Sequence, residues 1–166
     1  MGQGISLLCA CGKKENITLG IGMMYPEICE ETVDDIVNGV YGNEWKTLYE
    51  SKKYIVIDGE KYLFYCEKCG CWEVSLGLDL YEPNNIEEVR KIYYGKKMVE
   101  ESRYVLYMGE WKREQYYHLL KEYSHLCPKC KNIMIKTNDF EKSIFDNLVC
   151  THCGKTMQRH GILMWD

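Results

Sequence analysis

The sequence predicts an α+β protein held together by two groups of four cysteines, and three observations support this. Ten of the 166 residues are cysteines, and eight of them lie in four close pairs. Between residues 26 and 40, apolar side chains recur at the spacing of one helical face, and acidic side chains occupy the other. Short runs elsewhere alternate apolar and polar residues, as strands do. An apolar content of 46% provides a core for one domain or two small ones.

The first half of the chain predicts two helices and several strands. Pro26 suits the first turn of a helix, and Asn43 is expected to cap a second, shorter helix. Asp58-Gly59 predicts the turn of a β-hairpin that leads toward a cysteine pair. The strands are expected over residues 5–8, 15–19, 54–57, 61–65 and 72–76.

A break at Pro83-Asn84-Asn85 predicts that the chain changes unit there. A strand over residues 103–108 and a helix over residues 111–123 are expected to connect this break to the C-terminal unit. The expected parts are residues 1–83, 84–125 and 126–166.

The C-terminal part carries the strongest signal for a metal site. Two Cys-x-x-Cys pairs are separated by 19 residues, which suits two strands and a turn, so four thiolates are expected to meet at one tetrahedral Zn²⁺. The expected ligands are Cys127, Cys130, Cys150 and Cys153. Residues 126–166 resemble the zinc-ribbon superfamily, which implies a structural zinc ion and a small three-stranded sheet. Lys131 departs from that pattern, because a knuckle often has glycine there.

A second zinc site is expected in the N-terminal part, giving two Zn²⁺ per chain. Its expected ligands are Cys9, Cys11, Cys66 and Cys69. This part resembles a zinc ribbon with a long insertion, residues 12–65, although its first pair is one residue tighter than usual. In an alternative ligand set, Cys71 replaces one member of that short pair. The whole chain loosely resembles bacterial proteins of uncharacterised function with an N-terminal Cys-x-Cys-Gly, a Gly-x-Gly-Met loop and a C-terminal ribbon.

The composition indicates a reducing compartment rather than a framework of disulfides. Cys-x-x-Cys spacing is typical of metal sites. Residues 1–4 lack the basic and apolar regions of a signal peptide, and there is no run of about eighteen apolar residues to span a membrane. We therefore expect a cytoplasmic protein without a membrane partner.

Charge is unevenly distributed along the chain. The net charge is −4, but residues 1–85 carry a net −7 and residues 86–136 a net +4. The positive segment is also rich in aromatic residues, so it is a candidate for stacking bases and holding phosphates. The competing interpretation places these tyrosines in a core or a protein interface. The residues concerned are Arg90, Lys91, Tyr93, Tyr94, Lys96, Lys97, Arg103, Tyr104, Tyr107, Trp111, Lys112, Arg113, Tyr116, Tyr117 and Tyr123.

The remaining cysteine and the histidines do not form a catalytic motif. Cys29 lies on the apolar face of the first helix and is expected to be buried and inert. The spacing of His118, His125 and His160 matches no metal motif, and His152 is expected to point outward between two ligands.

The sequence therefore predicts a non-enzymatic interaction or adaptor module with structural zinc sites and a protein partner. Closed four-cysteine sites leave no position for a substrate or a reactive water. Nucleic-acid binding through residues 86–136 and a thiol-redox activity are the alternatives. The identity of the partner and the oligomeric state stay open.

Overall fold

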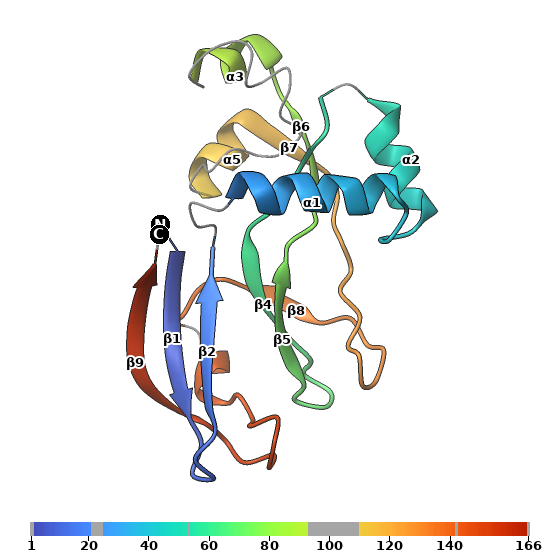
Figure 1. The fold of residues 1–166 in the computed structure, drawn as a ribbon. Helices are drawn as coiled ribbons and strands as arrows, with labels where there is room; N and C mark the ends of the chain where they lie inside the picture. Colours follow the sequence, from blue (N-terminus) through green and yellow to red (C-terminus); the bar gives the residue numbers. More distant parts are fainter. Residues whose placement is uncertain (1, 21–24, 53, 93–109, 142, 166) are drawn as a thin grey trace. The chain divides into compact units, whose positions relative to one another are not determined.

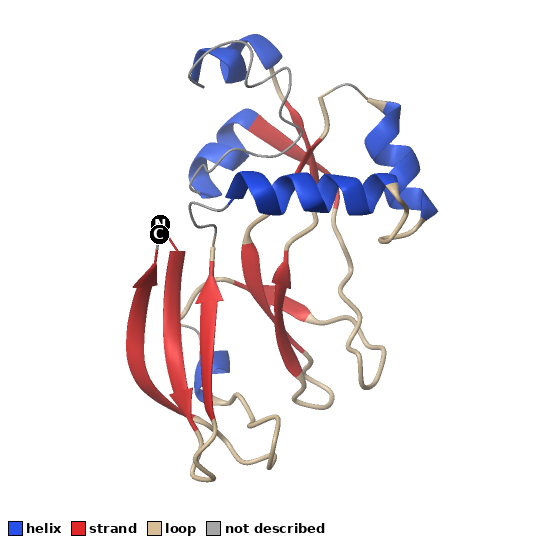
Figure 2. Cartoon of the chain, in the orientation of Figure 1, coloured by secondary structure: helices blue, strands red, loops and turns tan. Residues whose placement is uncertain are grey.

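The computed structural model describes residues 2–20, 25–52, 54–92, 110–141 and 143–165. It confirms a mixed α+β protein in which β-structure dominates (Figures 1 and 2). The described residues form three antiparallel sheets of three strands each, together with short helices. Within these residues, no helix has both the length and the apolar character needed to cross a membrane.

The chain divides into two compact units that do not follow the sequence in simple blocks. Unit 1 combines residues 1–23, 60–77 and 124–166, and unit 2 combines residues 24–59 and 78–123. Unit 2 is therefore made of two insertions into unit 1. This division cuts across the expected parts 1–83 and 84–125, because the chain leaves unit 1 and returns to it twice.

One sheet of unit 1 joins the two ends of the chain. Its strands are β1 (Gly2–Leu8), β2 (Lys14–Leu19) and β9 (Gln158–Trp165), in the order β2-β1-β9. Strand β1 pairs with β2 through a short connection that carries the first cysteine pair, and with β9 across the length of the chain (Figure 1). The alternation of apolar residues in β1 and β2 buries Ile5, Leu7 and Ile17 on one face.

The second sheet of unit 1 is built on the hairpin of β4 (Lys61–Tyr65) and β5 (Trp72–Leu76). Strand β8 (Ile135–Thr137) pairs with the other edge of β4, with Tyr65 opposite Ile135. The hairpin agrees with the expected return strand after the second cysteine pair. The pairing of β4 with β8 joins segments about seventy residues apart, and it matters for the metal sites below.

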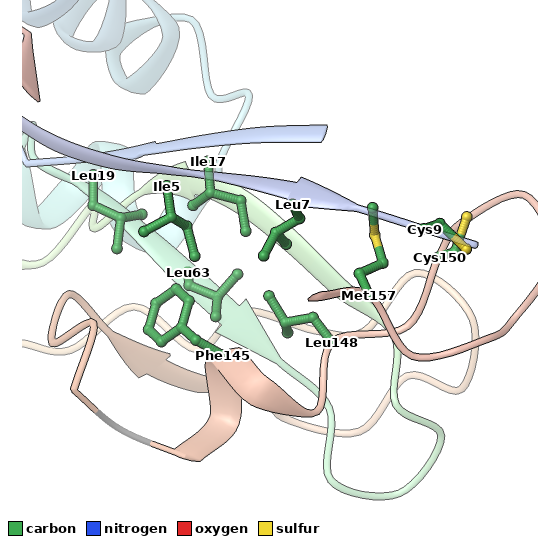
Figure 3. Packing of buried hydrophobic residues seen from close by; sticks show 10 residues of the cluster. All are labelled: Ile5, Leu7, Cys9, Ile17, Leu19, Leu63, Phe145, Leu148, Cys150 and Met157. Carbon is green, nitrogen blue, oxygen red and sulfur yellow. The ribbon is translucent and has the colours of Figure 1, made fainter. Parts of the chain in front are cut away.

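The main core of unit 1 lies beneath the first sheet (Figure 3). Leu63 of β4 reaches it, as does Phe145 from the 3₁₀ turn η1 (Ser143–Asp146), and both are fully buried. Two of the metal-site cysteines, Cys9 and Cys150, lie at one end of the same cluster. The cluster therefore continues into one of the cysteine groups described below.

Unit 2 contains the longer helices and the third sheet. Helices α1 (Tyr25–Val37) and α2 (Asn43–Ser51) come from the first insertion, while α3 (Ile86–Ile92) and α5 (Glu110–Tyr116) come from the second. The sheet order is β3 (Val56–Ile57), β6 (Leu80–Pro83) and β7 (Tyr117–Lys121). Helix α2 begins at Asn43, so Gly42 and not Asn43 occupies the capping position, and no side chain caps this helix.

A buried ion pair anchors unit 2. The guanidinium Nη1 of Arg113 lies 3.3 Å from Oδ2 of Asp58, and these side chains are 8% and 1% exposed. Arg113 also stacks over the ring of Tyr81, with its Cζ 5.3 Å from the ring centroid. This pair ties β3, β6 and α5 together.

Two sequence expectations fail because pairing partners far along the chain decide the structure. Asp58-Gly59 is not an exposed hairpin turn. Asp58 is buried, its N–H donates to the carbonyl of Asp79, and β3 pairs with β6 instead of β4. The expected helix over 111–123 ends at Tyr116, because residues 117–121 pair with β6 as a strand. The strand expected over 103–108 lies outside the described residues.

Candidate metal centres

Eight cysteines of unit 1 form two compact groups of four. In each group the Sγ atoms all lie within 4.8 Å of one another. Site A consists of Cys9, Cys11, Cys150 and Cys153. Site B consists of Cys66, Cys69, Cys127 and Cys130. In every pair the first cysteine is buried and the second is half-buried or exposed.

Each cysteine pair sits on a tight turn, and three of the four turns share one backbone pattern. In the three Cys-x-x-Cys turns, the N–H of the first cysteine donates to the carbonyl five residues later. The N–H four residues after the first cysteine donates back to that cysteine's carbonyl, at 2.8–2.9 Å. The donating first cysteines are Cys66, Cys127 and Cys150. Such a turn orients two sulfurs the same way, as a metal knuckle requires.

The residue that closes each turn adopts positive φ. Gly70 and Gly154 do so at φ 69° and 72°, and this region favours glycine because it lacks a Cβ. Lys131 occupies the same position at φ 61°, so the turn forms there despite its side chain. The Cys9–Cys11 turn closes one residue earlier: Gly12 N–H donates to the Cys9 carbonyl and Cys9 N–H to the Lys13 carbonyl.

The sulfur spacing suits a tetrahedral metal site better than disulfides. The Sγ atoms of Cys9 and Cys153 are 3.4 Å apart, and those of Cys11 and Cys150 are 3.8 Å apart. In site B the distances are 3.4 Å from Cys66 to Cys130 and 3.5 Å from Cys69 to Cys127. A disulfide would need about 2.05 Å. Four sulfurs at about 2.3 Å from a Zn²⁺ would lie roughly 3.8 Å from one another.

The two groups interleave along the chain, and this overturns the expected pairing. The sequence predicted that the first pair would meet Cys66 and Cys69, and that the last two pairs would meet each other. Instead, the first and fourth pairs form site A, and the second and third pairs form site B. The same result removes Cys71 as a replacement for Cys9 or Cys11.

Strand pairing explains the interleaving. Strand β1 runs into Cys9, and its partner β9 follows the turn that holds Cys150 and Cys153, with Leu8 opposite Gln158. Strand β4 runs into Cys66, and its partner β8 follows the turn that holds Cys127. Each site therefore forms where two paired strands bring their preceding or following turns together.

Comparison with protein-family models, with curated proteins and with solved structures finds no match to this chain. Two cysteine groups of this geometry can hold two metal ions. Ligation by these eight residues, and zinc as the metal, stay predictions.

A direct contact links the two sites within unit 1. Trp72 follows Cys71 of the site B turn, and its indole Nε1 donates to the carbonyl of Val149 at 2.7 Å. Val149 immediately precedes Cys150 of site A. The first residue of β5, just after the site B turn, is thus hydrogen-bonded to the residue that precedes Cys150 of site A.

Although burial opposes it, hydrogen bonds to sulfur lower the pKa of Cys127 and Cys130 in site B and of Cys150 in site A, and so favour their thiolates. The backbone N–H of Asn132 is the main cause that lowers the pKa of Cys130 to about 6, against the opposing effect of burial. The Asn132 side chain contributes to this shift, because its Nδ2 donates to the Cys130 Sγ at 3.2 Å. At Cys150, burial raises the pKa, but N–H groups of Cys153 and His152 outweigh it and the pKa falls to about 7.

Other cysteines in the same groups hold their protons. The N–H of Cys11 lowers the pKa of Cys9, but burial and neighbouring thiols outweigh it and raise the value to about 12. Cys69 behaves alike: the N–H of Cys71 lowers its pKa, and burial with thiols of site B raises it to about 12. A bound dication favours the thiolate at every ligand, so its binding would release these protons.

The remaining candidates do not join either group. Cys71 packs beside site B, where burial and then its neighbour Cys127 raise its pKa. Among the described residues, neither metal group contains a histidine. His125 stacks on Phe64 with ring centroids 3.7 Å apart, and His152 is exposed as expected. The side chain of Cys29 lies outside the described residues.

The described side chains of the basic, aromatic segment pack within unit 2. Arg113 is buried against Asp58, and Tyr117 is 4% exposed. Tyr123 makes edge-to-face contacts with Tyr41 and Trp45, with centroids 5.8 and 5.2 Å apart. These residues serve packing. The side chains of Arg90, Lys91, Tyr93, Tyr94, Lys96, Lys97, Arg103, Tyr104, Tyr107, Trp111 and Lys112 lie outside the described part of the chain.

Proposed function

We propose that this chain is a non-enzymatic interaction module whose metal-binding unit is stabilised by two structural Zn²⁺ ions. The observation that carries the proposal is the pair of interleaved cysteine groups, each with four sulfurs at tetrahedral spacing. Zinc fits this all-sulfur donor set, and four thiolates complete a structural site. A reducing cytoplasm is the compartment that keeps such thiolates available.

Because the two sites interleave along the chain, bound metal ions would link separate segments of unit 1. All three chain segments of unit 1 contribute to the sites: residues 1–23 to site A, residues 60–77 to site B, and residues 124–166 to both. Metal binding at the two sites would therefore tie the three segments to one another. Because binding free energy at such sites is also folding free energy, removing the metal should loosen unit 1 as a whole.

The interaction role is supported by what lies outside the metal sites. Unit 2 is formed by two insertions into a small metal-bound framework, and it has its own buried ion pair and sheet. Binding residues are often carried on connecting segments that a rigid scaffold positions. We therefore expect a protein partner, whereas a thiol-redox role would need free thiol pairs that bound zinc would occupy.

Metal analysis and thiol reactivity test this proposal together. Protein purified without chelator should contain two zinc ions per chain. Cobalt substitution should give the absorption spectrum of tetrahedral all-sulfur coordination. Fewer than one metal ion per chain would contradict the structural role. Turnover of a disulfide substrate by the fully zinc-loaded protein would favour the redox alternative instead.

A further inference from the structure

Strand β9 presents a free edge beside a cavity, and the two features together suit an extended peptide. Among the described residues, β9 pairs only with β1, so its outer edge has no strand partner (Figure 1). It is eight residues long and exposes Ile162 by 84% and Leu163 by 36%. A long, apolar, unpaired edge readily accepts another strand.

The cavity lies against β1 and β9 and against the loop that leads to η1. Its volume is about 630 Å³, within the range of natural ligand pockets. Ile5, Phe140 and Ile162 supply its apolar lining. The volume is sufficient for a bulky apolar side chain, and Ile162 belongs to both the strand edge and the cavity.

The charges that line the cavity favour a cationic ligand. Asp139, Glu141 and Asp146 contribute three carboxylates, against the single guanidinium of Arg159. Arg159 is already engaged, because its Nε lies 2.9 Å from Oδ1 of Asp146 and its Cζ lies 5.9 Å from the Phe145 ring centroid. Asp139 and Glu141 therefore give the cavity a net negative charge.

We propose that β9 and this cavity bind an extended peptide segment of a partner protein that carries a bulky apolar residue and, two positions away, a lysine or arginine. The segment pairs its backbone with the edge of β9, which is the strand-addition mode of recognition. Its apolar side chain lies against Ile162 over the cavity. Alternate residues of a strand point to the same face about 6.6 Å apart, so the basic side chain lies on the same face and can reach Asp139 or Glu141.

This inference rests on the interaction role proposed above and names the chemistry of the partner. A second copy of the chain is the competing occupant of the edge, because identical strands can pair antiparallel about a two-fold axis. The charges argue against it. The cation that β9 offers next to the cavity is Arg159, which is held by Asp146 of its own chain.

The test uses the full, zinc-loaded chain and a synthetic probe. The probe is a fluorescent, end-capped peptide in which threonine occupies every second position and leucine and lysine alternate at the positions between, so that a leucine and a lysine two positions apart share one face. Its binding is followed by anisotropy. Two control peptides accompany it. In one, glutamate replaces lysine. In the other, alternate backbone amides are N-methylated so that strand pairing is blocked while the side chains are kept. We expect the probe to bind and both controls to bind at least about tenfold more weakly.

Matched variants localise the binding to this site. Ile162→Lys should lower the affinity for the probe by about tenfold or more. The double change Asp139→Asn with Glu141→Gln should lower this affinity several-fold and make it less dependent on salt. Ile133→Lys, at a side chain 68% exposed elsewhere in unit 1, is the control for the first. Glu87→Gln with Glu88→Gln, on exposed side chains of α3, controls for charge.

Each outcome decides the inference. The inference is wrong if the probe does not bind, or if the N-methylated or acidic peptide binds as tightly as the probe. It is also wrong if the control variants lose as much probe binding as the site variants. If the unliganded chain forms a dimer, and the Ile162→Lys variant is a monomer, the edge of β9 is occupied by a second copy instead. Zinc content measured in the same samples separates the proposals: a variant with two zinc ions and no probe binding refutes the peptide site and leaves the metal sites standing.

Discussion

The hydrogen bond from Asn132 to the sulfur of Cys130 provides a quantitative test of site B. Asn132→Ala deletes the donation from Nδ2 to Sγ at 3.2 Å and keeps the backbone bond from Cys127 N–H to the carbonyl of residue 132. A hydrogen bond to a charged group contributes about 1.5–3 kcal/mol. Loss of a partner that hydrogen-bonds a ligand lowers metal affinity about 10–100-fold, which is about 1.4–2.7 kcal/mol. The two ranges agree.

Competition with a chromophoric chelator measures this effect on the two metal ions separately. In Asn132→Ala, one of the two metal equivalents should move to the chelator at about 10–100-fold lower chelator concentration, while the other stays unchanged. Asn147→Ala is the matched control, because its amide donates to the Ser143 carbonyl at 2.8 Å and not to a sulfur. If both equivalents weaken equally, or if neither does, the role assigned to Asn132 is wrong.

Three further predictions address the turns, the protons and unit 2. Lys131→Gly should stabilise the protein by about 0.5–1 kcal/mol, because the backbone strain relieved at φ 61° is larger than the entropy that glycine adds to the unfolded chain. A lower free energy of unfolding in denaturant would contradict this. Raised pKa values of about 12 at Cys9 and Cys69 mean that these thiols carry protons at neutral pH. Below about pH 9 the protonated thiols stabilise the metal-free fold, and a metal ion must displace their protons to bind. Metal affinity should therefore fall about tenfold per pH unit, for each proton displaced, as the pH decreases. A chelator competition that does not change with pH would refute this. Asp58→Asn should destabilise the protein by about 3–5 kcal/mol, because the buried guanidinium of Arg113 loses the negative charge of the Asp58 carboxylate. Adding Arg113→Met should restore part of that loss in thermal unfolding, and strict additivity of the two changes would argue against a coupled pair.

The sequence was sufficient to locate the four cysteine turns but not to say which turns meet. The Cys-x-x-Cys spacing and the glycine that follows are local features, and each turn is closed by hydrogen bonds within six residues. The assignment of turns to sites depends on β1 pairing with β9 and on β4 pairing with β8, which lie far apart along the chain. The expectation that neighbouring pairs would join had no local signal to correct it.

The failed elements of unit 2 have the same origin. Asp58-Gly59 has the composition of a hairpin turn, but Asp58 is buried by its ion pair with Arg113, about fifty residues further along. The run after Tyr116 has the spacing of a helical face, but residues 117–121 pair with β6 and form a strand. Expectations that rested on local spacing, such as the first helix and the β4–β5 hairpin, agree with the structure.

The interleaved assignment is tested most directly by mapping which cysteines lose protection when one pair is removed. Zinc-loaded Cys9→Ser/Cys11→Ser protein is treated with a thiol-alkylating reagent and the labelled cysteines are identified by mass spectrometry. We predict that Cys150 and Cys153 become labelled while the four cysteines of site B stay protected, with one zinc ion retained. Labelling of Cys66 and Cys69 with protection of Cys150 and Cys153 would contradict the assignment and restore the sequential pairing.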